Sequence, residues 1–193
     1  IGAKIIRNHA EVIGLKQSFT ILDKDDQLSL IKQIIKAENL DQSQFSPKLI
    51  QSKIDHWKNK ALNPNEIKSE TLDNLVDEKS LSIYQIYQAR LFEINCLDFG
   101  DLLLQCINLF KVSDIHKRYS NNFKYIHVDE YQDTNAAQYK WLKLLGSHHK
   151  NVCCVGDDDQ SIYSWRGAEV DNMLRFEKEF ENAKIIRLKQ NYR

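Results

Sequence analysis

Apolar residues recur about once per helical turn through most of the first 96 residues. The clearest such face comprises Ile50, Ile54 and Trp57, and it follows Ser46-Pro47, a pair typical of a helix start. Similar spacing predicts three further helices. The first covers residues 4–13 and ends at Gly14, the second begins after a cap at Asp25 or Asp26, and the third begins at Ser80. No strand pattern is evident, so we expect residues 1–96 to form a mainly helical subdomain.

The pattern changes after residue 97. Asp98 and Asp101 are spaced like a reciprocal N-cap that opens a helix reaching Phe110. Beyond it, short apolar runs alternate with helical patterns: strands over 125–128, 151–155 and 184–188, and helices over 136–145, closed by Gly146, and 170–180. This alternation is typical of an α/β fold in which helices cover a parallel sheet and ligands bind at the carboxyl ends of the strands.

Two adjacent carboxylates, Asp129 and Glu130, follow the first of these strands directly. Such a pair is the acidic half of a nucleoside-triphosphate site, in which Asp129 would offer oxygen ligands to Mg²⁺. Glu130 would orient or deprotonate the attacking water. An apolar run that ends in a solvated acidic turn is the alternative, and for these residues alone it is the commoner case.

Three longer blocks extend this pair: VDEYQDTN at 128–135, GDDDQSIYSWRGA at 156–168 and LKQNYR at 188–193. In order and spacing they resemble the UvrD/Rep/PcrA family of superfamily-one DNA helicases. The resemblance implies that 97–193 is the C-terminal half of the first RecA-like ATPase lobe, a partial parallel sheet, and that 1–96 is its helical insertion. It also implies an ATP-dependent 3′-to-5′ helicase or translocase that unwinds DNA in repair or replication restart.

The same resemblance implies catalytic roles at the phosphates. Asp129 corresponds to the Mg²⁺ ligand, Glu130 to the catalytic base and Gln160 to the γ-phosphate sensor, because an amide can donate to a phosphoryl oxygen and accept from a water. Arg166 and Arg193 correspond to the arginines near the γ-phosphate, where a permanent charge opposes the developing negative charge.

Aromatic residues complete the implied site. Tyr192 resembles the tyrosine that packs on the nucleotide base, so ATP and Mg²⁺ are the implied cofactors. Tyr163 and Trp165, two residues apart, resemble the pair that stacks on DNA bases, and stacking tolerates any sequence. Gln132 and Asp133 belong to the first block, but Asp133 could equally cap the helix over 135–145.

Composition restricts the partners. The chain has 27 basic and 27 acidic residues, so binding to single-stranded or tailed duplex DNA must rely on a local groove and on stacking. Repair or replication proteins are further possible partners. No apolar run reaches the roughly 20 residues of a membrane span. The cysteines form no CxxC pair, and we expect reduced core thiols in a cytoplasmic protein; His148-His149 is expected to be a turn rather than a metal site. Trp57 and Trp141 are expected in the core.

None of the six glycines is followed by lysine, so these 193 residues hold no GxxxxGK[ST] phosphate-binding loop. We therefore expect a piece of a larger motor that lacks ATPase activity on its own, without that loop and a second lobe. A helicase–nuclease subunit remains an alternative within the same class. A non-catalytic DNA-binding or docking module descended from a helicase is an alternative of another class.

Overall fold

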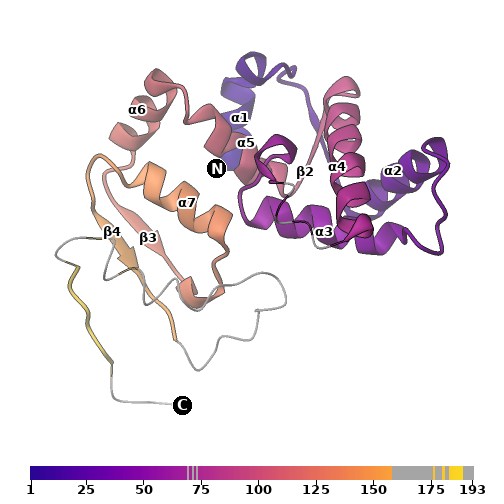
Figure 1. Cartoon of the computed structure of the whole chain (residues 1–193). Coiled ribbons are helices and arrows are strands. Elements are labelled where there is room, and N and C mark those ends of the chain that lie inside the picture. Colours follow the sequence, from indigo (N-terminus) through magenta and orange to yellow (C-terminus); the bar gives the residue numbers. More distant parts are fainter. Residues whose placement is uncertain are drawn as a thin grey trace.

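The structure is a computed structural model that describes residues 1–68, 70, 72, 74–157, 176, 180 and 183–188. Helices dominate this part of the chain, and its strands are short (Figure 1). The elements are α1 (Gly2–Asn8), η1 (Ala10–Ile13), β1 (Thr20–Leu22), α2 (Lys24–Ala37), α3 (Pro47–Asn59), η2 (Pro64–Glu66), α4 (Leu75–Glu93), β2 (Cys96–Asp98), α5 (Asp101–Leu109), α6 (Ser113–Asn122), β3 (Ile126–Val128), η4 (Tyr131–Asp133), α7 (Ala136–Leu145) and β4 (Val152–Cys154), where η marks a 3₁₀ helix.

The strands of the described residues form two parallel pairs. Thr20 of β1 lies opposite Cys96 of β2, and Ile126 of β3 lies opposite Val152 of β4. Helix α7 connects β3 to β4, which is the strand–helix–strand unit expected from the sequence. The predicted mixed α/β class with a partial parallel sheet is therefore confirmed.

Two strand predictions were wrong. β1 lies within the part expected to contain no strand; three residues are too short to show alternation, and β2, its partner, is more than 70 positions away. Conversely, residues 184–188 form no strand. Ile186 and Leu188 are 70% and 90% exposed there, so no described residue pairs with this run or buries it. The helix predicted over 170–180 falls almost entirely outside the described residues.

Helix ends follow local capping chemistry. Pro47 opens α3 as predicted. Gly14, with a φ of 77°, also ends the first helical segment as predicted, but this segment is α1 followed by η1 rather than one helix over 4–13. The reciprocal hydrogen bonds expected between Asp98 and Asp101 are present, because the Asp101 N–H donates to Asp98 Oδ1 at 2.9 Å and the Asp98 N–H donates to Asp101 Oδ2 at 3.2 Å. Helix α5 nevertheless begins at Asp101 itself, with Gly100 at the N-cap position.

Other helix starts differ from the prediction. The cap of α2 is Asp23, whose carboxylate accepts from the N–H groups of both Asp25 and Asp26. Helix α4 begins at Leu75 after an Asn74 cap rather than at Ser80. Helix α6 was not predicted, because its ten residues are mostly polar.

Apolar side chains gather in two main cores. One lies among α2, α3 and α4 and includes Trp57, which stacks on Tyr84 with ring centroids 5.8 Å apart. The other joins α1 and η1 to α5, α6 and Leu145 of α7. Trp141 is only partly buried beside this second core. The N-terminal helix thus packs against α5 rather than with the helices that follow it, and the domain boundary expected at residue 96 stays a prediction.

A buried ion cluster joins the α2–α4 group to β2 and α5. Lys58 of α3 places its Nζ 2.7 Å from Asp98 Oδ2 and 2.9 Å from Asp101 Oδ1, and the three side chains are at most 3% exposed. Tyr87 of α4 and Gln27 of α2 also donate to Asp98, at 2.9 and 3.2 Å. Several elements therefore converge on one lysine and two carboxylates.

Burial and charge set the ionisation of this cluster. Burial opposes the charge on Lys58, but the two carboxylates outweigh it, so the pKa of Lys58 is raised. Burial also opposes ionisation of Asp98, yet the Lys58 charge and several hydrogen bonds hold the pKa of Asp98 below its usual value. For Asp101, burial and then the Asp98 charge raise the pKa to about 6. One cation shared by two carboxylates leaves Asp101 the easier of the two to protonate.

Replacing Lys58 with methionine should destabilise the fold strongly. Removal of one partner from a buried ionic cluster leaves uncompensated charge and costs about 3–5 kcal/mol. Chemical unfolding of the wild-type and K58M chains would measure the loss. Lys32→Met, at an exposed position of α2, is the matched control and should stay within about 0.5 kcal/mol. Equal stability of the two variants would show that the cluster does not hold the helices to β2 and α5.

Asp101 should make stability depend on pH. Its folded pKa of about 6 exceeds the value of about 3.9 of an unfolded chain, so its contribution is complete below about pH 4 and is lost as pH rises toward 6. Asp98, with a lowered pKa, titrates below this window. Relative to Asp101→Asn, the wild-type chain should therefore lose roughly 3 kcal/mol of unfolding free energy between pH 4 and 6. Parallel pH curves for the two proteins would contradict the assignment.

Candidate functional site

Asp129 and Glu130 lie at the carboxyl end of β3, where the sequence predicted them. Strand β3 ends at Val128, so both carboxylates belong to the turn that follows, and both residues are exposed. The Glu130 N–H donates to Asp129 Oδ1 at 3.0 Å, which orients the first carboxylate along the turn. Two acidic groups are thus presented to solvent at one end of a parallel strand.

Glu130 has an unusual backbone conformation. Its φ of 51° and ψ of 43° lie in the left-handed region, which is costly for a residue with a side chain. Backbone pairing with β4 holds the turn in place: the Tyr131 N–H donates to Val155 O at 2.9 Å, and the Val155 N–H donates to Val128 O at 2.8 Å. The direction of the Glu130 side chain therefore depends on the pairing of β3 with β4.

Gln132 connects the two sequence blocks. Its side chain is buried, with 1% of the residue exposed. Nε2 donates to Glu130 Oε2 at 2.7 Å, and Oε1 accepts from the backbone N–H of Asp157 at 3.0 Å. Sequence reasoning placed Gln132 in the first block without a specific role. No sequence signal marks this role, because it depends on the burial of the glutamine, which is not visible in the sequence.

Asp133 does not cap α7. The cap is Asn135, which forms a capping box with Gln138: each side chain accepts from the other residue's N–H at 2.9 Å. Asp133 lies in η4, and its buried Oδ1 has no hydrogen-bond partner among the described residues. The capping alternative is therefore wrong.

A pocket of about 660 Å³ lies next to these residues. Its lining includes the acidic groups Asp129, Glu130 and Asp133 together with apolar side chains such as Trp141 and Leu142. Mg²⁺ is commonly held by one or two carboxylates, with waters and substrate phosphates as its other ligands. The carboxylates here fit that donor set. In the described part of the chain no group of three or more His, Cys, Asp or Glu could hold a metal ion, so a closed all-protein site is not formed there.

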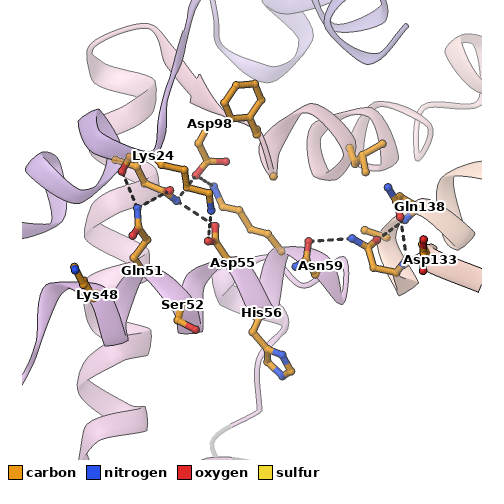
Figure 2. A pocket seen from close by; sticks show the side chains of 17 residues that line it. Lys24, Lys48, Gln51, Ser52, Asp55, His56, Asn59, Asp98, Asp133 and Gln138 are labelled. Carbon is orange, nitrogen blue, oxygen red and sulfur yellow. Dashed lines mark hydrogen bonds and ion pairs between the residues drawn. The ribbon is translucent and has the colours of Figure 1, made fainter. Parts of the chain in front are cut away.

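A second hollow, of about 920 Å³, lies along α3, between α2, the β2–α5 junction and the start of α7, and it is lined mainly by polar residues (Figure 2). Most of its polar groups bond to one another: Gln51 donates to the Lys24 carbonyl, Lys24 pairs with Asp55, and Asn135 donates to Asn59 Oδ1 at 3.0 Å. Burial, and then the charges of Lys60 and Lys53, lower the pKa of His56 at its edge. Hydrogen bonds therefore connect the helices α2 and α3 to each other and α3 to the start of α7 across this hollow, which was not predicted from the sequence.

The remaining predicted site residues lie outside the described part of the chain: Gln160, Tyr163, Trp165, Arg166, Tyr192 and Arg193. Their proposed roles are neither supported nor contradicted by the geometry.

The cysteine prediction was partly wrong. All four thiols are free, but only Cys96 and Cys106 are buried; Cys153 is exposed because alternate residues of β4 face opposite sides. His149 bonds through Nε2 to the Asn121 carbonyl at 2.9 Å. Among the described residues, no helix has the length and apolar character needed to cross a membrane.

Comparison with known proteins gives consistent matches over the chain. The UvrD/REP helicase N-terminal domain family matches residues 1–181. A probable DNA helicase II homolog of Rickettsia conorii is 48% identical over 196 residues, which cover 100% of this chain and 30% of that protein. The ATP-dependent DNA helicase PcrA of Staphylococcus aureus (strain Mu50) is 46% identical over 191 residues, or 98% of this chain and 26% of that protein. The chain therefore spans less than a third of the length of these relatives.

Proposed function

The chain belongs to the UvrD/REP helicase N-terminal domain family, and from this premise we propose that it forms part of the ATP-hydrolysing motor of a DNA helicase. The complete protein would bind ATP and Mg²⁺ and move 3′-to-5′ along single-stranded DNA, unwinding tailed duplexes in repair or replication restart in the cytoplasm. The observation that carries the proposal is the Asp129-Glu130 pair at the end of β3, joined through Gln132 to Asp157 of the second block.

The acidic turn would serve the phosphate chemistry. Asp129 would hold the metal ion, and its exposure leaves room for phosphate oxygens and waters in the remaining coordination positions. A Mg²⁺ ion bound there would neutralise charge on the phosphates. Glu130 would orient the attacking water and accept its proton, because it is the adjacent carboxylate and its direction is fixed by the left-handed turn.

Other residues of the motifs would complete the cycle. Gln160, Arg166 and Arg193 would contact the γ-phosphate, Tyr192 would pack on the nucleotide base, and Tyr163 with Trp165 would stack on bases of the strand. These 193 residues contain no phosphate-binding loop sequence, so we propose that the chain alone does not hydrolyse ATP.

Glu130→Gln should separate binding from hydrolysis in the complete protein. The amide keeps the size of the side chain but cannot accept the proton of water, so hydrolysis should fall about 10²–10⁴-fold. Nucleotide affinity should stay within about twofold, because Glu130 is not proposed to hold the nucleotide. Titration of a fluorescent nucleotide and single-turnover hydrolysis would measure the two effects. Glu38→Gln, at the exposed end of α2, is the matched control. Equal loss of binding and hydrolysis would contradict the assignment of Glu130 as the base.

Trp165→Ala should weaken binding of single-stranded DNA. Loss of one stacked base costs about 1–3 kcal/mol, which is about 5- to 150-fold in affinity. Fluorescence anisotropy with a labelled oligonucleotide would measure this, and ATP affinity without DNA should not change. Phe99→Ala removes an aromatic ring that is 59% exposed beside β2 and serves as the control. Unchanged DNA affinity in W165A would argue against the stacking role.

A further inference from the structure

The Gln132 amide is arranged as a bridge between a proposed catalytic group and a neighbouring segment. Its NH₂ group donates to Glu130 Oε2 at 2.7 Å while its oxygen accepts from the Asp157 N–H at 3.0 Å. We propose that Gln132 is a positioning residue that fixes the Glu130 carboxylate relative to the segment beginning at Asp157. The inference rests on the proposed role of Glu130 as the base. It adds Gln132 as the residue that orients this base and links the base to Asp157.

Burial makes both bonds necessary. Gln132 is 1% exposed, so water cannot replace a lost partner of its amide. A buried donor or acceptor left without a partner is costly, and a hydrogen bond to a charged carboxylate is stronger than one between neutral groups. The NH₂ group and the oxygen of the Gln132 amide therefore both have hydrogen-bond partners only when the Glu130 carboxylate and the Asp157 backbone are in their observed places.

The backbone conformation restricts the same turn from the other side. The left-handed conformation of Glu130 fixes where its Cβ points, and the bond from Tyr131 N–H to the Val155 carbonyl fixes the next residue. The three side-chain torsions that aim the carboxylate are then restrained by the bond from Gln132 Nε2. Because strained backbone persists only when its surroundings determine it, this turn has little freedom to aim the carboxylate elsewhere.

The oxygen of the Gln132 amide connects Glu130 to the second sequence block through Asp157. Asp157 opens the acidic run of the second block, and Gln160 follows it by three positions. A displacement of the Asp157 backbone would remove the N–H donor of Gln132 Oε1 and release the hold of Gln132 on Glu130. The orientation of the Glu130 carboxylate thereby depends on the position of the Asp157 backbone.

Gln132→Met, which keeps the side-chain length but removes both strong hydrogen bonds, tests the proposal in the complete protein. A misplaced general base should lower single-turnover ATP hydrolysis by up to about 10²-fold, whereas affinity for a fluorescent nucleotide should stay within about twofold. Without nucleotide, exchange of the Asp157 amide hydrogen should accelerate about tenfold, the factor of one hydrogen bond. Wild-type hydrolysis, or an unchanged Asp157 exchange rate, would overturn the inference.

A matched control separates positioning from general stability. Gln105 of α5 is also buried, at 4% exposure, and it accepts from Asn108 Nδ2 at 3.2 Å, apart from the acidic turn. Gln105→Met should lower the melting temperature while leaving hydrolysis and Asp157 exchange at their wild-type values. The inference fails if the two methionine variants lose hydrolysis in proportion to their loss of stability.

A double-mutant cycle distinguishes the failure of this inference from the failure of the proposed function. If Gln132 acts through Glu130, adding Q132M to E130Q should reduce hydrolysis no further, whereas independent effects would multiply. Multiplying effects would contradict the positioning role. Wild-type hydrolysis in E130Q alone would remove the base on which the inference rests, and the proposed function would fail first.

Discussion

The contact on which the arrangement of the chain depends is the buried pairing of Lys58 with Asp98 and Asp101. Asp98 ends β2 and Asp101 begins α5, so a single ammonium group fixes the strand–helix junction against α3. Tyr87 and Gln27 bring α4 and α2 to the same carboxylate. A lysine that is not exposed can keep its charge only if these partners stay in place, because an uncompensated buried charge is strongly unfavourable.

The same stretch of α3 also reaches the candidate site. Asn59, next to Lys58, accepts from the Asn135 side chain that caps α7. Only η4 separates this cap from Asp129 and Glu130 along the chain. Leu104 and Ile107 of α5 and Ala137 of α7 share a small core between these contacts. The helical group is therefore linked to the Asp129–Gln132 turn through polar contacts and a packed helix pair. A displacement of α3 would therefore also displace α7 and the turn that precedes it.

Local chemistry was predictable from the sequence, and long-range chemistry was not. The Asp98–Asp101 hydrogen bonds, the Pro47 start and the α7 boundaries depend on residues a few positions apart, so their patterns are visible along the chain. β1 depends on a partner strand more than 70 positions away, and the run 184–188 was taken for a strand although it pairs with no strand in the described part of the chain. Lys58 was overlooked because lysine is usually exposed, and only the three-dimensional convergence of two carboxylates makes its burial tolerable.

The candidate site shows the same division between local and distant causes. The acidic pair was placed correctly because it follows an apolar run, but the left-handed conformation of Glu130 contradicts the preference of glutamate. That conformation is maintained by backbone bonds to Val155 and by the Gln132 amide, which come from strand pairing and burial. Local rules are most often broken where function requires it. Because the turn can hold this strain only while β3 and β4 are paired, the orientation of the Glu130 carboxylate is a property of the folded sheet and not of the motif alone.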